Sequence, residues 1–323
     1  MNISFLRKIN SDGGPKNFQM KFINWLEDKD IKYDFCENFF LKKKIILVNA
    51  GSRRLIYLIY QKLIGAKIIQ RLDGVYNLND FENLRLKIKV LLSNLSMNII
   101  RILIADRIIY QSLFVKERWE YKFGKTKKNY KIIHNPSFNK FIPKYNFKKE
   151  FNILIMEGNV QNDKKTNQLL KLLFLASKRN KYIKNVFILG NINPEVQAKF
   201  RNDKYIKFLG YVPRKKLLQL LNKNKMIYFP VEFNASCPNS YIELISSGIP
   251  SCFIEGGSFS ELSKFSSVKI KNKSINISLI HEIDKALNKV CENYYSFRNL
   301  KLLVSWRYDR NYIFNKYIKF ILS

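Results

Sequence analysis

The residue types best suited to chemistry gather in one stretch, VEFNASCPNSYIELISSGIP, at residues 231–250. The pattern predicts a loop of small and polar residues and then a helix that a glycine closes. Pro238 suits a first helical turn, and Asn239 and Ser240 can cap the helix or donate hydrogen bonds. A helix N-terminus attracts phosphate, and Glu243, one turn inside, can accept bonds from vicinal hydroxyls such as those of a ribose. An ordinary capped helix with a solvent-facing glutamate is the alternative.

Two further groups follow expected strands in the first half of the chain. Gly13 and Gly14 open a helix after the first strand, and glycine there permits close approach of the backbone to a ligand. A plain strand-to-helix turn is the alternative. In QRLDGVYN, Arg71 and Asp73 end a buried strand beside a glycine. This charged pair is a candidate for sugar contact or acid/base work, and a structural ion pair is the rival interpretation.

These side chains need elements that bring them to one edge of a sheet. Apolar strand-like runs alternate with helical patterns in two series, which is typical of βαβ units around parallel sheets. In the first series we expect strands at 2–6, 45–48, 66–70, 107–110 and 130–133. In the second series we expect strands at 151–156, 186–189, 206–208, 226–229 and 251–254, with helices at 166–179, 194–200, 214–221 and 240–247. The sequence therefore predicts an α/β protein with two Rossmann-like domains facing a cleft, where ligands bind beyond the carboxyl ends of the strands.

The domain limits follow from composition. Residues 1–140 form the expected N-terminal domain, and the lysine-rich stretch 141–150, which has no clear period, is the expected linker. Residues 151–305 form the C-terminal domain, and 306–323 a last helix. The chain carries 58 Lys and Arg against 25 Asp and Glu, a formal net charge of +33, so an acidic partner is expected. A codon composition that favours lysine is the alternative explanation of this excess.

Other residue counts exclude several classes of site. The four cysteines are widely spaced, which speaks against a disulfide framework or a zinc site, and we expect a reducing, cytoplasmic location. His134 and His281 are the only histidines, so a catalytic scheme built on several histidines is unsupported. The segment 84–105 combines helically spaced apolar residues with Arg85, Lys87, Lys89 and Arg101. It predicts either a core-packed helix with a charged outer face or a basic helix lying on anionic lipid.

The order of several motifs resembles retaining glycosyltransferases of family four, which have the GT-B fold and use nucleotide sugars. The motifs are ADRIIYQSLFVKE, IIHNPSFNKFIP, the stretch from YVPRKK to SSGIP, EGGSFSEL, and VSWRYDRNYIFNKY. The resemblance implies that Glu243 holds the ribose and that Cys237, Pro238, Asn239 and Ser240 line the pyrophosphate and sugar. It also implies that donor phosphates lie near Gly13 and Gly14 and that the last helix crosses back to the N-terminal domain.

The sequence departs from that family at two points. The position eight residues before Glu243, where the family has a second glutamate, is Ala235, and Glu232 is three residues out of register. The family's Gly-Arg after the first strand of this half is Gly158-Asn159 here. The following lysine is matched by Lys164, with Lys165 beside it, and one of them is expected to neutralise the leaving phosphate. A solvated lysine pair is the alternative.

Together these observations predict an enzyme that moves a sugar from a nucleoside-diphosphate sugar to a hydroxyl of a glycan or lipid-linked acceptor. The resemblance implies retention of the anomeric configuration, no cofactor besides the donor substrate, and no metal. We expect a role in bacterial surface polysaccharide synthesis, such as lipopolysaccharide, O-antigen or capsule, at the inner face of the cell membrane. The alternatives are a sugar-nucleotide epimerase or phosphorylase on the same fold, or a basic nucleic-acid-binding protein, although no nucleic-acid-binding motif is present.

Overall fold

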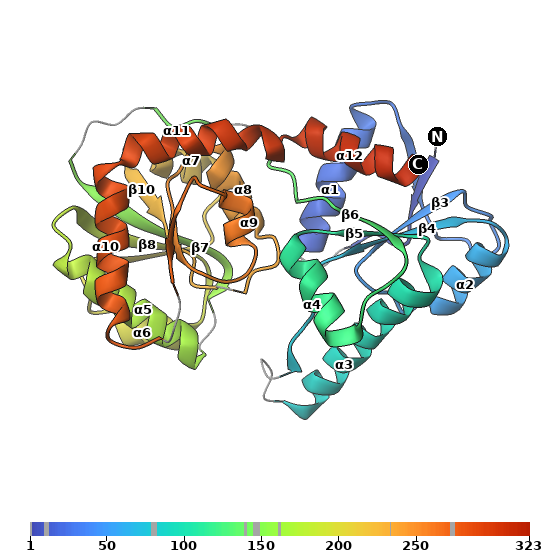
Figure 1. The fold of residues 1–323 in the computed structure, drawn as a ribbon, viewed down its shortest axis with the longest axis horizontal. Helices are drawn as coiled ribbons and strands as arrows, with labels where there is room; N and C mark the ends of the chain where they lie inside the picture. The colour runs from blue at the N-terminus through green and yellow to red at the C-terminus, as the bar shows by residue number, and fades with distance from the viewer. Residues whose placement is uncertain are drawn as a thin grey trace. The chain divides into compact units, whose positions relative to one another are not determined.

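A computed structural model shows two compact units, Met1–Pro136 with Arg310–Ser323, and Ser137–Asp309 (Figure 1). We call them unit 1 and unit 2. The structure describes residues 2–9, 13–78, 83–138, 141–144, 149–160, 163–232, 234–271 and 275–323. Both units are built on parallel sheets with helices on the two faces, so the predicted α/β class with two Rossmann-like domains is confirmed.

Unit 1 contains a six-stranded parallel sheet in the order β2-β1-β3-β4-β5-β6. Its strands are β1 (Asn2–Phe5), β2 (Lys32–Phe35), β3 (Ile45–Asn49), β4 (Lys67–Leu72), β5 (Arg107–Tyr110) and β6 (Asn129–Ile132). Its helices are α1 (Gly14–Glu27), α2 (Leu55–Leu63), α3 (Leu84–Ile99), the π-helical turn η2 (Ile100–Ile104), α4 (Leu113–Phe123) and α12 (Arg310–Leu322). Because helices cover both faces, most residues of the central strands are buried, and most of these buried residues are apolar.

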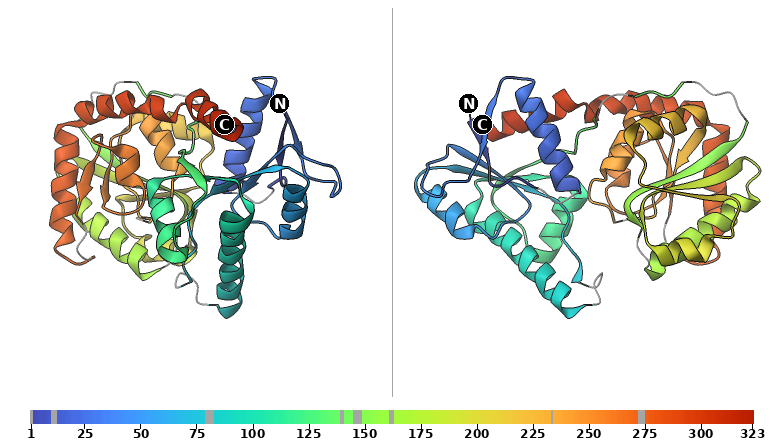
Figure 2. Two further views of the ribbon diagram at one scale, coloured as in Figure 1. Left: turned by 45° about the vertical axis from the view of Figure 1, so that its right-hand side comes forward. Right: turned by 180° about the vertical axis from the view of Figure 1, so that it is seen from behind.

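Alternation along the strands assigns each helix to a face of this sheet. Leu47 and Ile69 pack in the same apolar cluster as residues of α1 and α12. Their neighbours Ile46 and Ile68 pack in a second cluster with residues of α2, α3 and α4. Successive strand residues point to opposite faces, so α1 and α12 cover one face and α2, α3 and α4 the other (Figure 2).

The last helix, α12, packs against α1, the first helix of the chain. The rings of Phe22 and Phe314 lie 4.8 Å apart, and the indole N–H of Trp25 donates to Asn311 Oδ1 at 2.8 Å. Aromatic pairs at such distances add to the free energy gained by burying the rings. This packing explains why residues from the end of the sequence belong to unit 1.

Unit 2 contains a four-stranded parallel sheet in the order β10-β7-β8-β9 and a two-stranded sheet, β11-β12. Its strands are β7 (Phe151–Val160), β8 (Ile183–Ile192), β9 (Ile206–Gly210), β10 (Lys225–Tyr228), β11 (Cys252–Ile254) and β12 (Val268–Ile270). Its helices are α5 (Lys164–Arg179), α6 (Pro194–Phe200), α7 (Arg214–Lys223), α8 (Asn239–Ser246), α9 (Phe259–Ser263), α10 (Leu279–Glu292), α11 (Tyr294–Ser305) and the 3₁₀ turn η3 (Trp306–Tyr308). One parallel bridge, Tyr228 to Ser251, joins the two sheets.

Candidate functional site

The N-terminus of α8 is the centre of the candidate site in unit 2. Helix α8 begins at Asn239, one residue before the predicted start, and Pro238 is its N-cap with an extended backbone. The side chain of Pro238 makes no capping hydrogen bond. The first backbone N–H groups of a helix have no intrahelical acceptor, and the helix dipole makes this end positive. The end of α8 therefore keeps the anion-binding character that the sequence indicated.

Two carboxylates meet near the carboxyl ends of β7 and β10, and the sequence analysis assigned a role to neither. Glu157, on β7, is buried, and its Oε1 accepts a hydrogen bond from the backbone N–H of Val231 at 3.1 Å. Burial and the nearby charge of exposed Glu232 raise the pKa of Glu157 to about 8. Burial, with Glu157 nearby, also raises the pKa of Tyr228 far above its ordinary value. Glu157 is therefore largely protonated at neutral pH.

A close approach of two strands fixes the backbone at Glu157. A Cβ at Gly190, on β8, would lie 1.9 Å from the carbonyl oxygen of Glu157, and Gly190 has φ of +124°. Only glycine fits there. The pairing of β7 with β8 shifts register between Met156 and Asn159, and such irregularities often redirect side chains near functional sites. Gly158, at this shift, is exposed, and a Cβ on it would meet no atom within 4 Å.

Glu243 lies one turn inside α8, where the sequence placed it. Its Oε1 accepts a hydrogen bond from the backbone N–H of Phe138 at 2.7 Å. Its Oε2 lies 3.8 Å from a guanidinium nitrogen of Arg214, the first residue of α7. The carboxylate is partly exposed, so one face remains accessible to solvent. Its proposed contact with a ribose stays a prediction.

Lys164 and Lys165 are the first two residues of α5, two positions earlier than the predicted helix start. Both are exposed. The N-cap is Asp163, whose carboxylate accepts from the backbone N–H of Thr166 at 2.9 Å and from its hydroxyl at 2.6 Å. This cap fixes the start of the helix and leaves the two lysines to solvent. Their predicted contact with phosphate remains untested.

The side chains of the α8 loop differ in their accessibility. Cys237 is buried in the apolar cluster under α8, which also contains Tyr241 and Phe259. Pro238, Asn239 and Ser240 are partly exposed at the helix start. Any contribution of Cys237 to a bound ligand would therefore come from its backbone. Ala235, at the position of the missing glutamate, is buried and its carbonyl accepts from both the N–H and the hydroxyl of Ser258.

In unit 1, Arg71 is buried on β4 and contacts protein groups on several sides. Its guanidinium donates to Asn135 Oδ1 at 2.5 Å and to the hydroxyl of Tyr317 on α12 at 3.1 Å. Its Cζ lies 3.8 Å from the centre of the Phe18 ring. These contacts favour the structural alternative for Arg71 over its predicted sugar contact, because the side chain offers almost no surface to a ligand.

Asp73, two residues beyond Arg71, lies just past the carboxyl end of β4. Its Oδ1 is buried and has no hydrogen-bond partner among the described residues. Burial raises the pKa of this carboxyl, while the charge of Arg71 opposes the shift. A buried carboxyl with a raised pKa at a strand end is suited to act as a general acid or base. The predicted role of Asp73 stays a prediction.

A small surface pocket opens at the carboxyl ends of β1 and β3. It is lined by Leu6, Arg7, Ile9, Gln19, Leu47, Asn49 and Gly51. Both amide atoms of Asn49 are buried and lack a hydrogen-bond partner in the described part of the chain. The sequence analysis missed Asn49, although a polar residue that closes the apolar run IILVN signals a strand end. Gly13, the exposed N-cap of α1, and Gly14 also lie beyond the carboxyl end of β1.

A second small pocket lies in unit 2 beside Lys225, at the amino end of β10. It is therefore at the edge of the sheet opposite to α8's first turn.

Over the described residues, no group of three or more His, Cys, Asp or Glu could hold a metal ion. The triplet Asp28-Lys29-Asp30 follows the end of α1, and Asp28 pairs with Arg310 at 2.6 Å. Within the same residues, no helix is long and apolar enough to cross a membrane.

Comparison with solved structures identifies the fold. HepE (Alr3699) from Anabaena, solved with UDP, is 14% identical over 99% of each chain, with a TM-score of 0.69. Sucrose-phosphate synthase from Thermosynechococcus elongatus is 9% identical over 99% of this chain and 98% of that one, with a TM-score of 0.73. A glycosyltransferase from Rickettsia africae is 12% identical over 99% and 97%, with a TM-score of 0.62. The sequence matches no protein-family model and no curated protein.

Proposed function

Given the GT-B fold that these similarities establish, we propose that the chain is a glycosyltransferase. It transfers a sugar from a nucleoside-diphosphate sugar to a hydroxyl of a glycan or lipid-linked acceptor, with retention of the anomeric configuration. One observation carries the proposal. The start of α8, where Pro238 gives no side-chain cap, stands at the carboxyl edge of the unit 2 sheet, with a partly exposed carboxylate one turn inside.

The chemistry of the donor matches this edge. A diphosphate carries negative charge that the N–H groups at the start of α8 can accept, and the exposed Lys164 and Lys165 add positive charge. Glu243 offers an acceptor to the ribose hydroxyls. Protonated Glu157 adds no negative charge that would repel the phosphates. Since the Anabaena neighbours were solved with UDP and UDP-glucose, uridine is the first base to test.

The transfer itself breaks the bond between the anomeric carbon and the diphosphate oxygen. A bond from the same carbon to the acceptor oxygen forms on the same face, and the acceptor proton passes to the leaving diphosphate. No protein nucleophile is needed. Positive groups aimed at the leaving oxygen each contribute about 10²- to 10³-fold in rate. In unit 1, Asp73 and the pocket at Asn49 supply polar groups for the acceptor.

The role in assembly of bacterial surface polysaccharide, on the inner face of the cell membrane and without a metal, belongs to the same proposal. It rests on the order of the sequence motifs and on the net charge of +33.

The decisive assay measures release of the nucleoside diphosphate from UDP-, GDP- and ADP-sugars, with and without a lipid-linked glycan acceptor. We expect release with one base and strong stimulation by an acceptor, in the presence of EDTA as well as without it. Production of a sugar phosphate without nucleotide would identify a phosphorylase, and an epimerised donor with no transfer would identify an epimerase. Either result would contradict the proposal.

A further inference from the structure

Helix α3 buries Met97 in the apolar cluster of unit 1 but leaves most of its apolar side chains exposed. The polar side chains Asn94 and Ser96 attach it to the rest of unit 1, since Asn94 exchanges hydrogen bonds with the backbone of Tyr76 and Ser96 donates to the carbonyl of Ser52. Its apolar stripe points outward instead, with Leu84 70% and Leu91 49% exposed. A helix that buries amide and hydroxyl groups and leaves leucines in water implies something that covers the leucines.

The arginine of this segment is also on the unexpected side. Arg101, in η2, is buried and donates to the carbonyl oxygens of Phe123 and Gly124 at 3.2 and 2.8 Å. From the sequence, we placed Arg101 with the basic residues of a charged outer face and gave a core-packed helix and a lipid-bound helix as the two alternatives. The structure instead separates Arg101, which anchors η2, from Arg85 and Lys89, which are exposed beside the leucines. The core-packed alternative is therefore wrong for most of the apolar stripe.

Helix α2 presents a second apolar stripe. Ile56, Ile59 and Leu63 recur at helical spacing and are 78%, 47% and 81% exposed. Beside them lies the loop 37–44, where Phe40 is 77% exposed and packs edge-on against the ring of Tyr60, with centroids 6.4 Å apart. Exposed aromatic and aliphatic side chains thus stand together on α2 and this loop.

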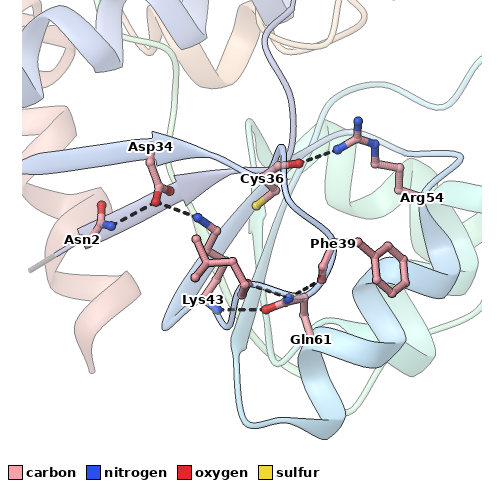
Figure 3. A network of polar contacts seen from close by, with 8 residues as sticks. Asn2, Asp34, Cys36, Phe39, Lys43, Arg54 and Gln61 are labelled. Atoms are coloured by element: carbon pink, nitrogen blue, oxygen red, sulfur yellow. Dashed lines mark hydrogen bonds and ion pairs between the residues drawn. The ribbon is translucent and has the colours of Figure 1, made fainter.

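The loop is held firmly, so its exposed residues are not loose. Buried Gln61 donates to the carbonyl oxygens of Phe39 and Leu41 at 3.3 and 3.0 Å, and its Oε1 accepts from the N–H of Lys43 at 2.9 Å (Figure 3). Lys43 Nζ in turn lies 2.8 Å from Asp34 Oδ2. One buried amide satisfying three backbone groups fixes the loop against α2. The apolar side chains are therefore presented on a rigid support.

The two stripes lie next to each other on unit 1. Helix α2 contacts η2, and Lys62 on α2 donates to the carbonyl of Ile104 at 2.5 Å and pairs with Asp106 at 3.1 Å. Figure 1 and both views of Figure 2 show α2 and α3 on the same face of the sheet. Leu103 is exposed on η2, the turn that follows α3 and contacts α2. We call the exposed apolar residues of loop 37–44, α2, α3 and η2 the outer face.

The charges around the outer face select its partner. Apart from exposed Glu37 at the start of the loop, residues 37–72 and 83–105 contain no aspartate or glutamate, and Lys42, Lys44, Arg53, Arg85 and Lys89 are exposed among the apolar residues. The nearby acids Asp34 and Asp106 are paired with lysines. A second copy of this chain would bring like charges together, and a nucleic acid would leave the leucines in water. An anionic lipid surface satisfies both the basic and the apolar groups.

We propose that the outer face docks unit 1 onto a membrane that contains anionic lipid, with the leucines and Phe40 entering the acyl boundary and the lysines and arginines meeting lipid phosphates. This inference rests on the proposed function only for its purpose, which is to bring the enzyme to a lipid-linked acceptor. Binding to lipid itself needs no sugar and no nucleotide.

The test measures co-sedimentation of the full chain with vesicles of phosphatidylcholine alone and of phosphatidylcholine and phosphatidylglycerol in equal parts. We expect binding to the anionic vesicles that weakens at high salt without vanishing, because apolar contacts persist when charges are screened. The variants Ile56→Ser with Leu63→Ser, and Leu91→Ser with Leu92→Ser, should each weaken binding about tenfold. The matched control, Ile277→Ser with Leu303→Ser, removes exposed apolar residues of unit 2 and should bind as the wild type does.

Three outcomes would overturn the inference: no preference for anionic vesicles, equal binding of the outer-face and control variants, or a dimer that only the outer-face variants dissociate. The substituted residues are exposed, so folding should persist, and circular dichroism verifies it. Stabilisation by UDP is measured on the same samples. Loss of lipid binding with UDP binding intact refutes only this inference, whereas lipid binding without any nucleotide binding refutes only the proposed function.

Discussion

The carboxylate of Glu243 accepts a hydrogen bond from the backbone N–H of Phe138 at 2.7 Å, inside unit 2. The same carboxylate faces Arg214 at 3.8 Å and remains partly open to solvent. One oxygen thus ties the first residues of unit 2 to α8, and the other faces Arg214 at the start of α7. A structural and a binding role for Glu243 are therefore separable by substitution.

Glu243→Gln keeps an oxygen that can accept from Phe138 and removes the negative charge. If the carboxylate holds a ribose, UDP affinity should fall about tenfold or more, because a bond to a charged group is stronger than one to a neutral amide. Melting temperature without nucleotide should change little. Calorimetric titration with UDP checks both quantities. Unchanged affinity would leave Glu243 with its structural role only.

Lys164→Ala with Lys165→Ala should leave the fold intact, since both side chains are exposed and the Asp163 cap remains. Turnover should fall about 100-fold or more if either lysine stabilises the leaving diphosphate. The matched control is Lys285→Ala with Lys289→Ala, which removes the same charge from exposed positions of α10. If the two double variants transferred sugar at equal rates, only the net charge of the chain would matter, and the position of Lys164 and Lys165 would not.

Glu157→Gln should make stability less dependent on pH. The carboxyl has a raised pKa of about 8 in the folded chain and an ordinary value of 4.5 when unfolded, so the folded state holds an extra proton between these values. The free energy of unfolding should therefore fall as pH rises from about 4.5 to 8. Above pH 8 the variant should be more stable than the wild type by a few kcal/mol, by chemical denaturation. Parallel curves for the two proteins would contradict the raised pKa.

Glu232 provides a second check of the same pair. Because its charge helps to raise the pKa of Glu157, Glu232→Gln should lower the upper pH limit of the stability loss and make the total loss smaller in the same denaturation experiment.

Gly190→Ala should destabilise unit 2 by about 3 kcal/mol or more, because its Cβ would overlap the carbonyl oxygen of Glu157 and its φ is positive. Gly158→Ala is the natural control, since a Cβ there meets nothing within 4 Å. That control should fold normally, and any loss of UDP affinity would indicate close approach of the donor to Gly158. Normal stability of Gly190→Ala would contradict the described strand approach.

Arg71→Met should lower the free energy of unfolding by about 3 kcal/mol or more, since it removes the buried hydrogen bonds from the guanidinium to Asn135 and Tyr317. The result would be seen in urea unfolding of the full chain. A variant of normal stability that has lost sugar transfer would restore the sugar-contact role for Arg71 that the sequence suggested.

Local patterns predicted the regular elements well. The apolar run Arg107–Tyr110 was predicted exactly, and so was helix Pro194–Phe200, because proline pre-sets its first turn. Strands β2 and β12 were missed. β2 is a partly exposed edge strand, KYDF, and β12 has only three residues with a lysine between its apolar ones, so neither carries a clear apolar signal.

Only those parts of the site could be predicted in which a residue's role depends on its position within one helix or strand. The start of α8 and Glu243 inside it follow from local sequence. The raised pKa of Glu157 does not, because it depends on Glu232, far along the chain, and on burial that only folding produces. Arg71 was misjudged for a related reason. This charged residue near a strand end is covered by α12, and the residues around Arg71 in the sequence do not show that α12 packs there.

The central claim is that the start of α8 binds a nucleoside diphosphate, and a crystal structure of the chain with UDP tests it most directly. The account predicts the diphosphate on the backbone N–H groups of Asn239 and Ser240 and the ribose hydroxyls within hydrogen-bond distance of Glu243. UDP bound elsewhere on the chain, or absent from crystals grown with millimolar nucleotide, would contradict it.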